Sequence, residues 1–127
     1  MYAQTYKDIE LIVVDDGSSD GARELLSEWA EKRDFLVVLQ ENIGIFKNLN
    51  NAITGLSGGE YIVFLASDDL YRPSKIEGQV RMLEVSPNAD LCYTQGIEFD
   101  DASGSELRTF PSRLVTGNVL SSIFLHK

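Results

Sequence analysis

Short apolar runs recur along the chain, and each is followed by a stretch with helical spacing. Runs at residues 9–14, 35–39 and 61–65 are rich in β-branched and aromatic residues, which predicts strands buried on both faces. A fourth strand is expected at 91–98. The stretches 21–32, 45–56 and 73–86 carry apolar residues at the spacing of a helix. Strands that alternate with helices predict right-handed βαβ units on a mostly parallel sheet.

Length and charge limit the classes of protein to which the chain can belong. Its 127 residues suffice for a single domain, 1–127, with its own core. A net charge of −9 argues against sequence-independent binding to nucleic acid or to an anionic membrane, because both depend on clustered basic residues. The chain shows neither a signal peptide nor an apolar run of bilayer length. We expect it in the cytoplasm, or peripheral to the inner face of a membrane in the full-length protein.

Two acidic pairs stand at the ends of predicted strands. Asp15 and Asp16 close the first run, and Asp68 and Asp69 follow the third. Parallel sheets bind ligands at the carboxyl ends of their strands, so both pairs are expected in one crevice. Carboxylates that lie close together repel one another unless a cation compensates their charge. Oxygen ligands alone favour Mn²⁺ or Mg²⁺, whose coordination shell is commonly completed by substrate phosphates.

An ordinary structural role is the alternative for both pairs. Aspartate, serine and glycine are common turn residues, and aspartate side chains often cap the helix that follows. This alternative has more weight for "DDGSSD" than for the second pair, because "SDD" follows a wholly apolar run.

Three blocks of the sequence together resemble the family 2 glycosyltransferases of the GT-A fold. They read "QTYKDIELIVVDDGSSDG", "ENIGIFKNLNNAI" and "GGEYIVFLASDDLYRPSKIEGQV", and they span roughly residues 3–90 in the family's order. The resemblance implies an α/β, Rossmann-like GT-A sheet that is mostly parallel and flanked by helices. It also implies inverting, metal-dependent transfer of a sugar from a nucleotide sugar to a hydroxyl acceptor, as in cell wall or polysaccharide biosynthesis.

The resemblance assigns roles in binding the donor to residues after the first strand. Asp15 and Asp16 correspond to the acidic pair of which one member accepts a hydrogen bond from the nucleotide base, commonly the uracil of a UDP-linked sugar. Gly17 lets the backbone turn away behind them. Lys47 lies where family members often carry a basic residue near the sugar nucleotide, although a solvated helix lysine remains the alternative.

The second acidic pair corresponds to the family's DXD region. There the acids contact the ribose and hold the Mn²⁺ or Mg²⁺ that bridges the diphosphate, so Asp68 is expected in both roles and Asp69 on the metal. Ala66 stands where many members have another aspartate, which leaves the division of these contacts open.

The family pattern also extends beyond both ends of this sequence. Members usually begin with a strand that lies between the first and third strands expected here, and their catalytic base comes after the last residue of this chain. We therefore expect an incomplete GT-A domain, to which no catalytic residue is assigned and which is inactive alone. Exposed sheet edges would then pair with one another or with a second copy, giving a homo-oligomer.

Two other functions remain open from the sequence. One is a non-catalytic nucleotide-binding or interaction module derived from this fold. The other is a flavodoxin-like phosphoacceptor domain, which also places acids at strand ends but fits the third block less well.

Overall fold

The structure is a computed structural model that describes residues 1–117. It divides into two units, one spanning Met1–Arg81 and one beginning at Met82, and each is described by itself. Within the described residues, no helix combines the length and the apolar character that crossing a bilayer requires. The sequence also indicates a last helical stretch at 118–125, which lies outside the described residues.

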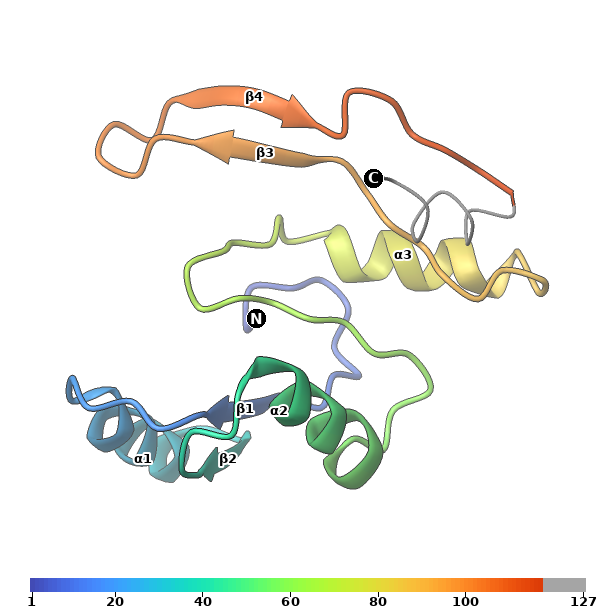
Figure 1. Cartoon of the computed structure of the whole chain (residues 1–127). Helices are drawn as coiled ribbons and strands as arrows, with labels where there is room; N and C mark the ends of the chain where they lie inside the picture. Colours follow the sequence, from blue (N-terminus) through green and yellow to red (C-terminus); the bar gives the residue numbers. More distant parts are fainter. Residues whose placement is uncertain (118–127) are drawn as a thin grey trace. The chain divides into compact units, whose positions relative to one another are not determined.

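A parallel pair of strands is the centre of the first unit. Strand β1 (Ile12–Asp15) pairs with β2 (Leu36–Leu39), with Ile12 opposite Leu36 and Asp15 opposite Leu39. Helix α1 (Ala22–Lys32) connects the two strands and packs on β2 (Figure 1). The first two predicted strands and the crossover helix are thereby confirmed, and β1 and β2 end at the same edge.

The helix predicted at 45–56 forms in two parts. Helix α2 (Ile45–Asn51) begins after Gly44 and continues without a break into η1 (Ala52–Leu56), a π-helical turn. The Ser57 N–H donates to the Ala52 carbonyl at 3.0 Å, which gives the wider turn its closing hydrogen bond. Contacts between η1 and β1 hold this helix against the parallel pair.

The third predicted strand, at 61–65, is wrong. This segment belongs to neither sheet of the described residues, and its five side chains are between 36% and 52% exposed. A run with strand propensity becomes a strand only beside a backbone with which it can pair, and the parallel sheet described here contains β1 and β2 alone. The Tyr71 hydroxyl instead donates to the Phe64 carbonyl.

The chain entering β1 holds the start of helix α3 (Lys75–Glu84). Gln4 is only 2% exposed; its Nε2 donates to the Arg72 carbonyl at 2.9 Å and its Oε1 accepts the Ile76 N–H at 3.2 Å. The Thr5 N–H donates to the Pro73 carbonyl at 2.8 Å. Gln4 thus caps α3, whose Ile76 side chain is buried.

The second unit contains an antiparallel hairpin. Strand β3 (Gly96–Phe99) pairs with β4 (Glu106–Phe110). The strand predicted at 91–98 therefore forms only from Gly96 onward. It pairs with the next strand in the chain, β4, and the two strands are antiparallel. Before it, the Tyr93 hydroxyl exchanges hydrogen bonds with the backbone of Val115, which satisfies polar groups that a longer strand would have paired.

Candidate functional site

The carboxyl ends of β1 and β2 bring together two loops that are distant in sequence. Asp15 is the last residue of β1, and Gln40 follows the last residue of β2. The Gln40 N–H donates to the Asp15 carbonyl at 3.1 Å and extends the parallel ladder by one bond. The side chains of Asp16 and Gln40 therefore emerge at the same edge, where parallel sheets bind ligands.

Asp15 organises the turn that leaves β1. Its side chain is almost completely buried, and its Oδ1 accepts the N–H groups of Gly17 at 3.2 Å and Ser18 at 3.1 Å. Arg23 of α1 places its Nε 3.6 Å from the same oxygen. The Ser18 side chain, these N–H groups and Arg23 together lower the pKa of Asp15 against the opposing effect of burial. Asp15 is thus an ionised turn residue.

Asp16 reaches across to the loop after β2. Its Oδ1 accepts Gln40 Nε2 at 2.6 Å and the Ile43 N–H at 3.0 Å, and its Oδ2 accepts the Gly44 N–H at 3.0 Å. The Ile43 N–H contributes most to lowering the pKa of Asp16, followed by Gln40, and Gly44 adds to the effect. The carboxylate is therefore ionised and fastens the loop to the end of β1.

Gly17 is required where it stands for two separate reasons. Its φ of 94° lies in the left-handed region, which residues with a side chain rarely adopt. A Cβ at this position would also come 2.9 Å from the backbone nitrogen of Asn42. The turn after β1 and the loop after β2 thus approach one another more closely than any other residue would allow.

Lys47 lies on α2, directly after this loop. The helix begins at Ile45, next to the Gly44 N–H that Asp16 binds, and Lys47 is exposed in its first turn. Asp16 thereby sets the position at which α2 presents Lys47.

The second acidic pair lies in an exposed turn. The Asp69 N–H donates to the Ala66 carbonyl at 3.2 Å, and both Asp68 and Asp69 are exposed. Burial raises the pKa of the Tyr71 hydroxyl, and the negative charge of Asp69 adds to this effect. The far end of the segment is held to the entry of β1 through Gln4.

Residues 1–117 contain no group of three or more histidine, cysteine or acidic side chains able to hold a metal ion. Asp68 and Asp69 by themselves would provide a two-carboxylate site. The donor set fits Mn²⁺ or Mg²⁺, since both take one or two carboxylates and complete their shell with water and substrate phosphates. Within the described residues, Asp15 and Asp16 hydrogen-bond to the turn after β1 and the loop after β2, whereas Asp68 and Asp69 lie in an exposed turn.

Sequence reasoning overlooked two glutamines. Gln40 could have been identified because it follows the second strand at the same register as Asp16 follows the first. Gln4 carried no local signal, since its partners lie 68 and 72 residues away.

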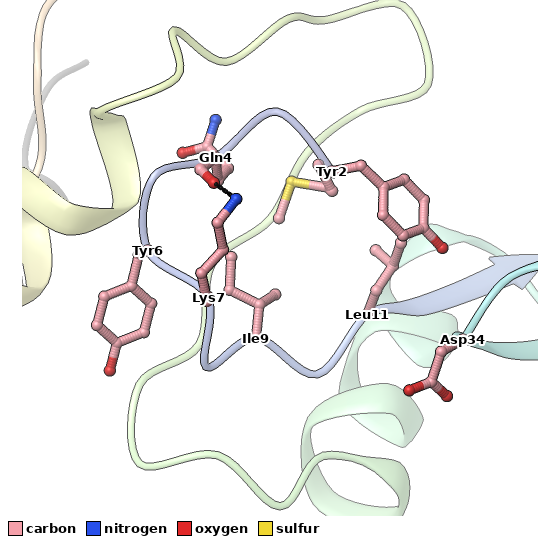
Figure 2. Close-up of a pocket in the computed structure, with 8 residues that line it drawn as sticks. Tyr2, Gln4, Tyr6, Lys7, Ile9, Leu11 and Asp34 are labelled. Atoms are coloured by element: carbon pink, nitrogen blue, oxygen red, sulfur yellow. Dashed lines mark hydrogen bonds between the residues drawn. The ribbon is translucent and has the colours of Figure 1, made fainter.

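A pocket of about 220 Å³ lies near the amino-terminal end of β1, and neither acidic pair lines it (Figure 2). It is lined by Met1, Tyr2, Gln4, Tyr6, Lys7, Ile9, Leu11 and Asp34. The Lys7 ammonium donates to the Gln4 carbonyl at 2.8 Å. Most of its lining comes from the segment that caps α3 and enters β1, which indicates a structural role for this pocket.

Comparison with known proteins gives the relationships of the chain. The family model described as Glycosyl transferase family 2 matches residues 1–122. An uncharacterized glycosyltransferase of Rickettsia conorii is 43% identical over 109 residues, which cover 84% of this chain and 17% of that protein. A second, from Rickettsia typhi, is 39% identical over 83% of the chain and 32% of that protein. Glycosyltransferase GlyA of Streptococcus pneumoniae is 33% identical over 102 residues, which cover 80% of this chain and 14% of that protein.

The chain thus spans between 14% and 32% of the length of these relatives. No solved structure matches it.

Proposed function

Because the chain belongs to glycosyl transferase family 2, whose fold is the α/β, Rossmann-like GT-A fold, we propose that it binds a UDP-linked sugar at the carboxyl ends of β1 and β2. Family membership itself implies a nucleotide-sugar donor and an acceptor. The observation that carries the proposal is the Asp16 carboxylate, which three donors hold ionised at this edge of the sheet.

A fixed, ionised acceptor suits recognition of a nucleotide base. The turn formed by Asp15 and Gly17 orients the backbone on both sides of Asp16, and the loop after β2 orients its carboxylate. An imide N–H of uracil would then meet an acceptor that needs no reorganisation. Lys47, in the first turn of α2, would offer its positive charge to the diphosphate or the sugar.

The second acidic pair would hold the divalent cation. Asp68 and Asp69 would bind Mn²⁺ or Mg²⁺ together with the diphosphate, and Asp68 would also contact the ribose. The ion would neutralise charge on the leaving nucleoside diphosphate during inverting transfer to a hydroxyl acceptor. In a chain with a net charge of −9, such a cation would reduce the repulsion between the carboxylates and an anionic donor and so tighten donor binding.

Calorimetry of UDP binding, in excess Mn²⁺ and in chelator, tests this assignment. Mn²⁺ should tighten UDP binding, and UDP should tighten Mn²⁺ binding by the same factor. Asp68→Asn and Asp69→Asn should each reduce this coupling, while Asp16→Ala should weaken UDP binding with and without metal. Asp101→Asn, which removes an exposed carboxylate from the second unit, is the matched control.

Equal affinity in chelator and in Mn²⁺ would contradict the metal site. Coupling that survives in both Asp68→Asn and Asp69→Asn would show that the pair consists of turn residues only.

The proposal assigns donor binding to this chain and no catalytic residue. We expect the 127-residue chain by itself to bind the donor without transferring its sugar, because the resemblance places the base outside it. Incubation with a labelled UDP-sugar and hydroxyl acceptors, followed by chromatography, measures this. Transfer to any acceptor would contradict the expectation.

The segment 61–65 supports self-association as part of the same proposal. It is an apolar run with strand propensity that lies outside both described sheets, and its side chains are substantially exposed. Such a segment tends to pair with a strand from another molecule, here a second copy. Sedimentation should show a concentration-dependent dimer that Val63→Lys weakens, and a monomer at every concentration would overturn this part of the proposal.

A further inference from the structure

The Asp16 carboxylate has little acceptor capacity left for a ligand. An ionised carboxylate offers about four acceptor positions, two on each oxygen. Gln40 Nε2 and the Ile43 N–H occupy Oδ1, and the Gly44 N–H takes one position on Oδ2. The remaining position is on Oδ2, so a ligand can place one N–H there and none on Oδ1.

Gln40 is held in the place where it closes Oδ1. Its backbone N–H is tied to the Asp15 carbonyl at 3.1 Å, and its side chain donates to Asp16 at 2.6 Å, the shortest of the three bonds on this carboxylate. Both side chains are partly buried. The other bond on Oδ1 comes from the loop backbone, so Gln40 is the one side chain whose replacement reopens a position on this oxygen.

The common nucleotide bases make different demands on a carboxylate. Uracil presents a single N–H flanked by two carbonyl oxygens, so a second free carboxylate oxygen would face a carbonyl and repel it. Guanine presents two neighbouring N–H groups, which a carboxylate binds with both of its oxygens. Bidentate hydrogen bonds to a charged acceptor are strong, and losing one of them is costly.

We propose that Gln40 is a specificity-determining residue: by occupying Oδ1 of Asp16 it leaves a single acceptor position, which fits uracil and disfavours guanine. The inference rests on the proposed function, in which the Asp16 carboxylate accepts a hydrogen bond from the base. Gln40 itself acts through Asp16 and is a positioning residue.

A purely structural role for Gln40 predicts a different result. If its side chain only fastened the loop, then its loss would loosen the site and weaken every nucleotide by the same factor. A specificity role predicts that UDP and GDP respond differently. The ratio of their dissociation constants therefore separates the two roles, and stability alone does not.

The experiment measures UDP and GDP binding by calorimetry in excess Mn²⁺ for the 127-residue chain and its variants. Gln40→Leu and Gln40→Met both remove the N–H donor while keeping an apolar stem of similar size. Two variants are used because either could disturb the loop, and circular dichroism checks that each is folded. Gln95→Leu, which removes a glutamine of the second unit that donates to the Pro111 carbonyl, is the matched control.

The unchanged chain should prefer UDP to GDP, and both Gln40 variants should reduce that preference by about tenfold, the value of one hydrogen bond to a charged group. Gln95→Leu should leave the preference unchanged. If folded Gln40 variants keep the same ratio of UDP to GDP dissociation constants, this inference is overturned. The proposed function still stands in that case, provided that the chain binds UDP. Binding of neither nucleotide by the folded, unchanged chain would overturn both.

Discussion

Replacing Gly17 with alanine tests whether the turn after β1 and the loop after β2 are interlocked as the structure shows. Gly17 has a φ of 94°, and a Cβ added there would meet the backbone nitrogen of Asn42 at 2.9 Å. Gly21 offers a matched comparison, because its φ is 91° and a Cβ there meets nothing within 4 Å. The two alanine variants therefore share the backbone strain and differ in the steric contact.

The expected magnitudes follow from these two effects. A left-handed conformation costs a residue with a Cβ about 1–2 kcal/mol, which is the whole expectation for Gly21→Ala. Forcing an extra carbon against packed backbone adds about 1–3 kcal/mol, so Gly17→Ala should cost roughly 2–5 kcal/mol in the free energy of unfolding. The added carbon also pushes Asn42 away and strains the bond from the Ile43 N–H to Asp16.

Urea unfolding followed by tryptophan fluorescence measures this difference. Trp29 is the chain's only tryptophan and lies on α1, so its emission reports on the first unit. In the absence of urea, the affinity for UDP should fall more in Gly17→Ala than in Gly21→Ala. Equal losses of stability in the two variants would refute the close approach of the two loops.

Other perturbations test the remaining contacts of the first unit. Gln4→Leu should lower the free energy of unfolding by about 1–3 kcal/mol, because it removes the acceptor that binds a buried N–H at the start of α3. The control Glu24→Gln, which changes an exposed residue of α1, should have little effect in the same urea assay. Acid should destabilise the protein through Asp15 and Asp16, whose lowered pKa values make them stabilising above pH 3.8 and progressively less so as the pH falls from there through their folded values. Replacing the second of them, Asp16→Asn, should flatten that acid limb in urea titrations, and an unchanged slope would contradict the hydrogen bonds assigned to it.

Local pattern was enough to predict much of the first unit. The β-branched run before Asp15 and the helical spacing that ends at Lys32 indicated β1 and α1 without any knowledge of their partners. The turn at Asp15 and Asp16 followed as well, because aspartate and glycine directly after a strand favour a turn. These features depend on the conformations and side chains of near neighbours in sequence, which the sequence displays directly.

Pairing and hydrogen-bond partners were decided only in the tertiary structure. The run at 61–65 has the composition of a strand, yet it lies outside both sheets because strand formation needs an adjacent backbone. In the same way, Asp16 was expected to face a ligand, and three of its acceptor positions are taken by groups 24 to 28 residues away. Composition and spacing determine what a segment can form, while contacts between distant residues determine which hydrogen bonds and strand pairs it makes.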